Sequence, residues 1–229
     1  MTLTDLLNRL SRWVFDHRTY RRRAIDRWLR ENRRLLHGRV LDLGSKRKAR
    51  RGLFALDPGP DDRWIALDCN ARMEPEVVAR GEQIPFGDAV FDAVVCSEVI
   101  EHVAQPRELI DEICRVLRPG GFLLLTSPFL YGIHGDPYDY QRLTETRLRE
   151  MLHSFHKMEF TVSGYFPSVV GDTLKRTLHG TRRRFVYKYL FYPLFPIVHI
   201  MILCERRPMF RRLYAWESAI SGYMIVARK

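Results

Sequence analysis

The residues best suited to acid–base chemistry lie together in one short segment late in the chain. An imidazole takes up a hydroxyl proton near pH 7, so His134 is the candidate general base, and Asp136 or Asp139 could orient its ring. A structural interpretation is equally open, in which Asp139 pairs with Arg142 and Thr144 caps the next helix. Because much of catalysis is positioning, a reaction here need not require a base at all.

A second group of small and polar residues follows apolar runs that are typical of buried strands. Gly44, Asp68, residues 96–98 and residues 127–128 each come directly after such a run. The carboxyl ends of parallel strands meet at one edge of a sheet, and ligands bind in the crevice outside that edge. The sequence therefore predicts a ligand site formed by these strand ends.

The elements that position these residues alternate between strands and helices. Short apolar runs bounded by turn residues predict strands, and apolar residues spaced three and four apart predict helices. The strands are expected at 39–44, 64–68, 91–96, 121–126, 159–164 and 222–227, and the helices within 3–37 and at 106–117 and 144–155. This alternation is typical of an α/β fold, with a parallel sheet covered on both faces.

Five stretches, in this order along the chain, resemble the motifs of class I S-adenosylmethionine-dependent methyltransferases of the type 11-like group. They are residues 40–44 (VLDLG), Asp68, residues 82–94 (EQIPFGDAVFDAV), residues 97–103 (SEVIEHV) and residues 117–123 (LRPGGFL). The resemblance covers about residues 38–165 and resumes at the final strand. It implies a Rossmann-like fold with a seven-stranded, mostly parallel sheet, the last strand antiparallel, and helices on both faces.

The resemblance also implies that S-adenosyl-L-methionine is the cofactor. In this family the turn after the first strand brings backbone amides to the methyl donor, and a strand-end carboxylate accepts hydrogen bonds from both ribose hydroxyls. Asp42 is open to a second interpretation, as a brace of that turn, and Glu101 and His102 are expected to cap and pack the helix that follows. The cofactor-binding residues carried over from the family are Asp42, Gly44, Ser45, Asp68, Glu82, Gln83, Cys96 and Ser97.

The sequence departs from the family pattern at two places. After the first strand the family usually continues as G-x-G-x-G, whereas this chain has Lys46 and Lys48, which do not adopt positive φ freely. Arg80 stands where the family often keeps the aspartate that holds the adenine amine, and Glu82 could replace that carboxylate. These departures motivate an alternative hypothesis, a degenerate methyltransferase-like module that binds without catalysis.

The segment from His134 to Thr144 resembles the H-x-x-P-x-D-(Y/F)-x-R-x-T pattern of a methyltransferase subgroup of cell-surface saccharide and lipid pathways. The resemblance implies methyl transfer to oxygen of a small, saccharide or lipid-linked acceptor. An RNA methyltransferase is a further alternative. Residues 97–99 differ from the Asn/Asp-Pro-Pro-aromatic motif typical of base amino-group methylation, and no RNA-binding module is recognisable, so nucleic acid is disfavoured.

The net charge of +11 is concentrated in two parts of the chain. Residues 9–51 carry 16 Lys and Arg against four acidic residues, and residues 172–212 carry ten against two. The segment between them, residues 52–171, has ten basic and 19 acidic residues. The excess positive charge therefore lies in the N-terminal arm with its adjoining turn and in a late insertion, although residues 46–48 of that turn fall inside the motif that resembles a cofactor site.

Basic residues flank an apolar and aromatic stretch within residues 173–212, which favours an element lying in an anionic membrane interface. The Arg-rich helix at 18–34 could contact the same surface. A lid over the acceptor pocket is the other interpretation of 173–212. Pro193 and Pro196 are expected to break it into two short helices.

The expected organisation is a basic helical arm, residues 1–37, and a methyltransferase domain, residues 38–229, with a basic and aromatic helical insertion at about 166–216. The four cysteines form no C-x-x-C pair, and residues 1–16 lack the features of a secretory signal. We therefore expect a cytoplasmic protein, peripheral on the inner face of the membrane. The sequence leads us to assign no metal site.

Overall fold

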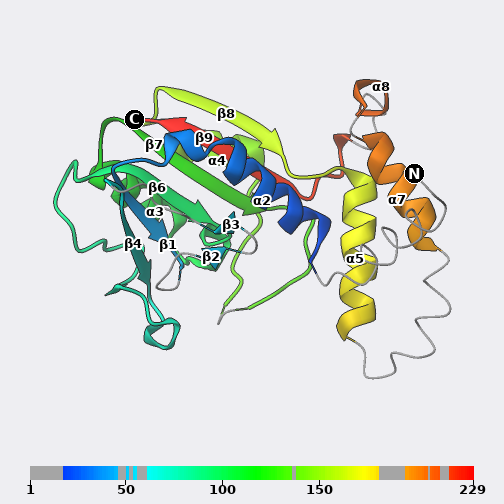
Figure 1. Cartoon of the computed structure of the whole chain (residues 1–229), viewed down its shortest axis with the longest axis horizontal. Helices are drawn as coiled ribbons and strands as arrows, with labels where there is room; N and C mark the ends of the chain where they lie inside the picture. Colours follow the sequence, from blue (N-terminus) through cyan, green and yellow to red (C-terminus); the bar gives the residue numbers. More distant parts are fainter. Residues whose placement is uncertain are drawn as a thin grey trace. The chain divides into compact units, whose positions relative to one another are not determined.

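The computed structural model describes residues 18–45, 50–51, 54–55, 61–135, 138–180, 194–205, 207–211 and 217–229. The expectations for residues 1–17, Lys46, Lys48 and Asp136 lie outside the described residues. Two compact units are present, drawn in Figure 1. Unit 1 consists of Met1–Ala24 and Gly164–Ser221, and unit 2 consists of Ile25–Ser163 and Gly222–Lys229.

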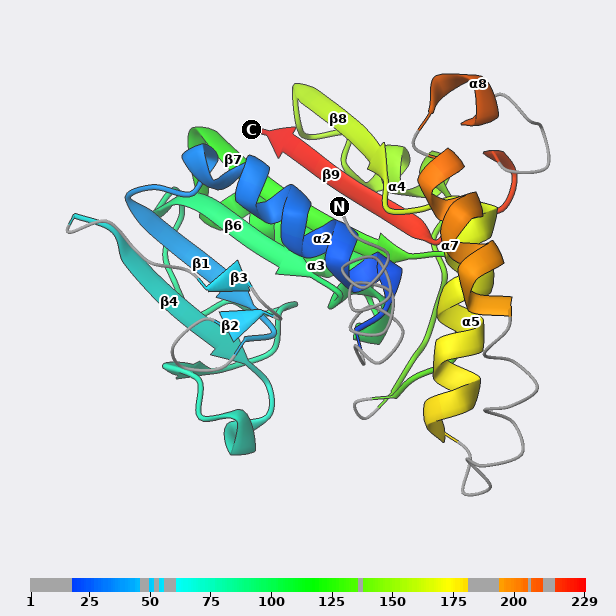
Figure 2. The same ribbon diagram turned by 45° about the vertical axis from the view of Figure 1, so that its right-hand side comes forward.

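Unit 2 is built on a seven-stranded sheet in the order β5-β4-β1-β6-β7-β9-β8, best followed in Figure 2. The pairs from β5 to β7 are parallel, and β9 is antiparallel to both of its neighbours, β7 and β8. This confirms the predicted mostly parallel sheet with its last strand antiparallel. The strands are β1 (Arg39–Leu43), β4 (Arg63–Asp68), β5 (Val77–Val78), β6 (Phe91–Ser97), β7 (Leu117–Pro128), β8 (Lys157–Val162) and β9 (Gly222–Arg228).

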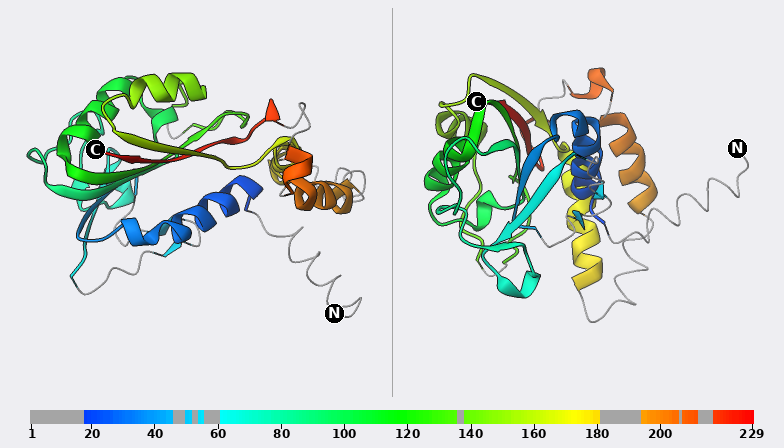
Figure 3. Two further views of the ribbon diagram at one scale, coloured as in Figure 1. Left: turned by 90° about the horizontal axis from the view of Figure 1, so that it is seen from above. Right: turned by 60° about the vertical axis from the view of Figure 1, so that its left-hand side comes forward.

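Helices cover both faces of this sheet. In Figure 3, left, α2 (Tyr20–Glu31) lies on one face, and α3 (Pro106–Val116) and α4 (Glu145–Met151) lie on the other. Ile25 and Leu29 of α2 are fully buried in one cluster with the strand residues Val40, Ala93 and Leu124. Short 3-10 turns follow α2 and the strands, at Arg33–Leu35 (η1), Ala71–Met73 (η2) and Ile100–His102 (η3).

Local sequence signals explain where α3 and α4 begin. Pro106 occupies the first turn of α3, where its missing amide hydrogen costs no helical hydrogen bond. Thr144 caps α4, since its side chain accepts a hydrogen bond of 3.3 Å from the amide of Arg147. The predicted cap at Thr144 is therefore confirmed.

The sequence did not predict the shortest strands. Val77–Val78 of β5 pairs with the end of β4, and the antiparallel pair of β2 (Arg50–Arg51) and β3 (Phe54–Ala55) forms a separate small sheet. A strand of two residues is too short to show the alternation by which strands are recognised. Only pairing with a neighbour identifies these segments.

Unit 1 is helical and includes α5 (Phe166–Gly180), α7 (Leu194–Glu205) and α8 (Pro208–Arg211). Helices α5 and α7 lie side by side in Figures 1 and 2, with Val198 and Ile202 of α7 packed in one cluster with Tyr20. Gly171 permits this packing, because a Cβ there would lie 2.6 Å from the Tyr20 ring. Within the described part of the chain, no helix is long and apolar enough to span a membrane.

The prolines near α7 act differently from our expectation. Helix α7 begins at Leu194, directly after Pro193, and Pro196 lies in its first turn. First-turn amides have no acceptor within the helix, so proline is tolerated there. The expected break at Pro196 is therefore wrong, and α7 continues without interruption to Glu205.

The compact units do not coincide with the ranges expected for an arm and a domain. The division falls between Ala24 and Ile25, inside α2, rather than after residue 37. From Ile25 onward, α2 contributes to the core beneath the sheet, because its apolar face is buried against the strands. Residues 25–37 thus pack as part of unit 2.

A buried carboxylate in unit 1 predicts a specific pH dependence. Asp172 is 3% exposed and accepts hydrogen bonds from the Tyr20 and Arg21 amides at the start of α2. Burial raises the pKa of Asp172 from 3.8 to about 6, so the folded protein holds this proton more tightly than the unfolded chain. The contribution of Asp172 is therefore greatest below pH 4 and falls as the pH rises through 6.

Replacing Asp172 by asparagine removes the titrating carboxyl group. Between pH 4 and pH 6.5 we expect the free energy of unfolding of the wild type to fall, relative to that of Asp172→Asn, by roughly 2–3 kcal/mol. Urea denaturation of both proteins across this range measures the difference. A constant difference would contradict the raised pKa.

Candidate cofactor and acceptor site

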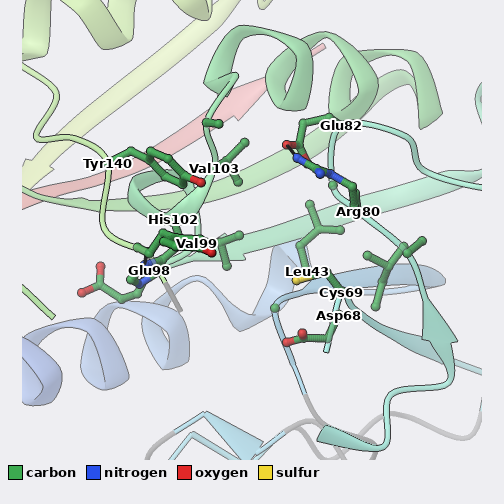
Figure 4. Close-up of a pocket in the computed structure, with 16 residues that line it drawn as sticks. Leu43, Asp68, Cys69, Arg80, Glu82, Glu98, Val99, His102, Val103 and Tyr140 are labelled. Carbon is green, nitrogen blue, oxygen red and sulfur yellow. Dashed lines mark hydrogen bonds and ion pairs between the residues drawn. The ribbon is translucent and has the colours of Figure 1, made fainter. Parts of the chain in front are cut away.

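A cavity of about 350 Å³ opens at the carboxyl edge of β1, β4 and β6 (Figure 4). Three of its lining residues lie at the ends of these strands: Gly44 and Glu98 directly follow β1 and β6, and Asp68 is the last residue of β4. The predicted meeting of strand ends is thus observed for Gly44, Asp68 and Glu98, whereas residues 127–128 do not line the cavity. The other lining residues are Leu43, Leu67, Cys69, Ala79, Arg80, Gly81, Glu82, Val99, His102, Val103, Ala104, Tyr138 and Tyr140.

The backbone holds the Gly44 turn and Asp68 in place. Gly44 has φ of 68°, a conformation that strongly favours glycine, and its amide donates to the carbonyl of Leu67 at 2.7 Å. The carboxylate of Asp68 accepts a hydrogen bond of 2.7 Å from the amide of Asn70. A glycine turn and an oriented strand-end carboxylate therefore lie side by side in the cavity wall.

Arg80 and Glu82 form one side of the cavity. The Arg80 guanidinium lies 2.8 Å from a carboxylate oxygen of Glu82, and the two side chains are 67% and 9% exposed. Arg80 donates a hydrogen bond to Glu82, and this bond raises the pKa of Arg80. Figure 4 shows the two side chains next to each other across the cavity from Glu98. Arg80, which departs from the family pattern, is thus neutralised by the carboxylate expected to replace the missing aspartate.

Glu98 belongs to the strand end at residues 96–98 that the sequence predicts to form the site, but it is not among the cofactor-binding residues carried over from the family. It has φ of 56°, a strained conformation for a residue with a side chain, of the kind that concentrates at functional sites. Its amide donates to the Thr126 hydroxyl at 3.0 Å, and that hydroxyl donates to its carboxylate at 2.8 Å. Thr126, in the neighbouring strand β7, therefore locks the strained turn. The SEVIEHV motif contains Glu98, but the motif does not indicate its backbone conformation.

Five of the predicted cofactor residues do not line the cavity. Asp42 and Cys96 are fully buried within β1 and β6. Ser45 is buried and donates to the carbonyl of Asp42 at 3.0 Å, as a brace of the turn, and Ser97 is buried with its hydroxyl 3.0 Å from that of Thr126. Gln83 is exposed. These residues support the wall of the cavity, and the predicted set contributes Gly44, Asp68 and Glu82 to its surface.

The imidazole that lines the cavity belongs to His102, not to His134. Our expectation that His102 only packs the following helix is thus incomplete. The two rings meet edge to face with centroids 5.0 Å apart, so His134 lies behind His102. His134 is 31% exposed, and burial together with the neighbouring His102 lowers its pKa. A neutral His134 has the protonation state that a general base requires.

Asp139 forms the ion pair with Arg142 that the structural interpretation predicted. Its carboxylate pairs with Arg142 and also accepts a hydrogen bond of 2.9 Å from the amide of His134. The hydrogen bonds from Arg142 hold the pKa of Asp139 well below its usual range, so it remains ionised. Asp139 therefore anchors the segment that presents His134, and its carboxylate lies 3.5 Å from the His134 Nδ1 atom.

Comparisons with known proteins identify the part of the chain that carries the motifs. Residues 42–125 match the family model of a methyltransferase domain. An uncharacterized methyltransferase of Mycolicibacterium vanbaalenii is 46% identical over 83 residues, which are 36% of this chain and 32% of that protein. A demethylmenaquinone methyltransferase of Mycobacterium bovis is 46% identical over 55 residues, 24% of each chain. The chain thus aligns with about a third or less of the length of these curated relatives.

Solved structures share the fold over most of the chain. A SAM-dependent methyltransferase from Archaeoglobus fulgidus has a TM-score of 0.55 at 15% identity, covering 91% of this chain and 94% of that one. The 1,6-didemethyltoxoflavin-N1-methyltransferase of Burkholderia thailandensis, solved with S-adenosylhomocysteine, has a TM-score of 0.52 at 16% identity, covering 92% and 78%. At these levels of identity the structures show a shared fold. The chain has the Rossmann-like fold of class I methyltransferases, and its residues 42–125 are similar to methyltransferase domains.

Proposed function

We propose that this protein transfers a methyl group from S-adenosyl-L-methionine to an oxygen atom of a small, saccharide or lipid-linked acceptor. The observation that carries the proposal is the cavity at the strand edge, where Gly44 and Asp68 lie together in the segment that matches methyltransferase domains. Its volume of about 350 Å³ falls within the range of small-molecule sites.

The residues of the cavity wall fit the parts of this cofactor. The Asp68 carboxylate suits the two ribose hydroxyls, and the turn at Gly44 lets backbone amides approach the methionine part closely. Glu82, paired with Arg80, offers carboxylate oxygens to the adenine amine. When bound, the cofactor supplies an electrophilic methyl group on its sulfonium sulfur. The chain positions the acceptor in line with that methyl group, which is where most of the rate enhancement is expected to arise.

The acceptor side of the cavity is formed by His102, Tyr138 and Tyr140. The two tyrosine rings lie 5.7 Å apart, and Tyr138 and Tyr140 are 62% and 53% exposed at the cavity mouth. Exposed aromatic rings next to polar groups suit the mixed apolar and hydroxylated faces of a saccharide. The neighbouring imidazoles of His102 and His134 are suited to a hydroxyl acceptor, whose proton must leave when the oxygen is methylated.

Calorimetric titration of the full chain with S-adenosylhomocysteine, the demethylated product, tests the proposal directly. Binding of one molecule per chain is expected, and absence of binding would overturn the proposal in favour of the degenerate module. Activity is then measured by incubating the protein and labelled S-adenosylmethionine with hydroxylated saccharide extracts, with lipid extracts and with RNA. Label transferred only to RNA would establish the alternative RNA methyltransferase.

We also propose that unit 1 docks on an anionic membrane surface. Helix α7 is apolar around its circumference, and it exposes one row of side chains spaced three residues apart. The members of this row, Leu194, Ile197, Ile200 and Leu203, are between 41% and 61% exposed. The basic composition of the surrounding residues 172–212 supplies the charge complementary to acidic headgroups.

Placing glutamate in the exposed row is expected to weaken membrane association. For the double variant Ile197→Glu and Ile200→Glu we expect at least a ~10-fold loss of binding to vesicles that contain acidic phospholipid, because the apolar row would carry two charges into the interface. Flotation with acidic and with neutral vesicles measures this loss. Val78→Glu changes an apolar side chain of unit 2 that is 57% exposed, and it should bind like the wild type. Equal flotation of all three proteins would contradict the proposal.

A further inference from the structure

Three side chains with metal-binding atoms converge beside the cavity. Glu101 and His102 are consecutive residues of η3, and His134 comes from the segment after β7. An oxygen of Glu101 lies 3.7 Å from the Nε2 atom of His134 and 3.8 Å from the Nε2 atom of His102. One donor atom from each of the three residues lies within 4.8 Å of the others.

Hydrogen bonds at the far side of each imidazole fix which nitrogen faces the cluster. The Nδ1 atom of His102 lies 2.6 Å from the carbonyl oxygen of Tyr138, and that of His134 lies 3.3 Å from the carbonyl oxygen of Gly132. A carbonyl only accepts hydrogen bonds, so each Nδ1 carries the hydrogen. In the neutral rings both Nε2 atoms then direct lone pairs toward the Glu101 carboxylate. This pattern, with Nδ1–H on a backbone carbonyl, is typical of histidines that ligate metals.

The segments that carry the three side chains are held together by further contacts. The amide of Tyr140 donates to the carbonyl of Glu101 at 2.9 Å, and the Gln141 side chain donates to the carbonyls of Ile100 and Val103. Asp139, itself paired with Arg142, binds the His134 amide. The donor atoms are therefore positioned before any ion binds, which lowers the cost of assembling a site.

We propose that Glu101, His102 and His134 bind one divalent first-row transition metal ion through a carboxylate oxygen and two Nε2 atoms. Two imidazoles and one carboxylate are a ligand set that suits Zn²⁺, Fe²⁺ and Mn²⁺. Bonds near 2.1 Å place ligand atoms about 3.0–3.4 Å apart. The two distances to Glu101, 3.7 and 3.8 Å, therefore need to shorten by a few tenths of an ångström, and every other donor pair starts within 4.8 Å. The Glu101 side chain is 1% exposed, so a cation bound beside it would lower the cost of burying its charge.

Three protein ligands would leave coordination positions open on a bound ion, and because His102 lines the cavity, a ligand in the cavity could reach them. An acceptor hydroxyl bound there would become more acidic, as water does on catalytic zinc. The proposed effect of the ion on the acceptor hydroxyl rests on the proposed methyl transfer, whereas metal binding itself does not. The ion would thus select acceptors with an oxygen ligand near the methylated atom.

The test is metal titration of the full chain after dialysis against a chelator. Calorimetry with Zn²⁺ and visible absorption with Co²⁺ should both give one ion per chain, and the Co²⁺ spectrum should lack the charge-transfer band of a thiolate ligand. Glu101→Gln and His134→Gln should each weaken binding at least ~10-fold, because each removes a ligand. His153→Gln replaces an exposed histidine of unit 2 and should bind as the wild type does.

Glu101 is buried, so Glu101→Gln could weaken metal binding simply by disturbing the fold. His134 is partly exposed, and His134→Gln therefore tests the loss of a ligand with less risk of misfolding. Both must show the thermal unfolding transition of a folded protein. Absence of stoichiometric binding, or equal affinity in the wild type and in both folded variants, would overturn the site. Titration with S-adenosylhomocysteine in the presence of chelator separates the proposals, because product binding without any metal binding overturns only the metal site. Metal binding without product binding overturns only the methyl transfer.

Discussion

Replacing Asp68 by alanine is expected to weaken S-adenosylhomocysteine binding by about 10- to 150-fold. A carboxylate that accepts hydrogen bonds from two hydroxyls contributes about 1.5–3 kcal/mol, and its loss changes the dissociation constant by that factor. Asp68 stands at the end of β4 in the cavity wall, fixed by the amide of Asn70 at 2.7 Å. Calorimetric titration of both proteins measures the change in affinity.

A matched control separates binding from stability. Asp111 lies on α3 outside the cavity, where it pairs with Arg107 at the surface, and Asp111→Ala should bind the product with wild-type affinity. Asp68→Asn should show an intermediate loss, because the amide oxygen still accepts from Asn70 whereas the charge is gone. Equal affinity of Asp68→Ala and Asp111→Ala would place the cofactor elsewhere.

Replacing Leu124 by alanine is expected to reduce the free energy of unfolding by about 2–5 kcal/mol. Leu124 is fully buried in β7, between Val95 of β6 and Val226 of β9, and it packs in the same cluster as Ile25 and Leu29 of α2. Because strands flank it on both sides and a helix covers it, the structure has little freedom to fill the space left behind. Urea denaturation monitored by circular dichroism measures the loss.

The same substitution at an exposed position provides the comparison. Leu130 follows β7 and is 43% exposed, so Leu130→Ala leaves no cavity and should change the free energy of unfolding by less than about 0.5 kcal/mol. Each protein should bind S-adenosylhomocysteine with equal affinity per folded molecule, since neither side chain lines the cavity. A similar loss for both variants would mean that β7 is not in the centre of the core.

Much of the fold is encoded in local sequence. Apolar runs predicted β1, β4 and β6 within a residue or two, because buried central strands need continuous apolar side chains. The resemblance to a family implied seven mostly parallel strands with the last one antiparallel, but the order β5-β4-β1-β6-β7-β9-β8 was not predicted, since pairing between distant strands leaves no local signal. For the same reason the boundary of the units inside α2 was not predicted.

The candidate site shows a similar division. Gly44 and Asp68 could be identified from the sequence because a glycine and a carboxylate directly after buried strands have a local pattern. Asp42, Cys96 and Ser97 share those motifs, but their side chains are buried in the sheet and do not line the cavity, which residue type and spacing alone do not reveal. The strained turn at Glu98 depends on Thr126 in another strand, which no linear motif reveals.

The sequence by itself determined the fold class, the segment similar to methyltransferases and the strand ends that form the cavity, because these depend on residue type and short-range spacing. Only the tertiary structure decided that His102 faces the cavity and that His134 meets Glu101 from a different segment, about 30 residues along the chain. Contacts across such separations depend on the path of β7 and the loop that follows it. The physical reason is that packing and hydrogen bonding in three dimensions decide which side chains meet. Residues far apart in the sequence become neighbours only once the chain has folded.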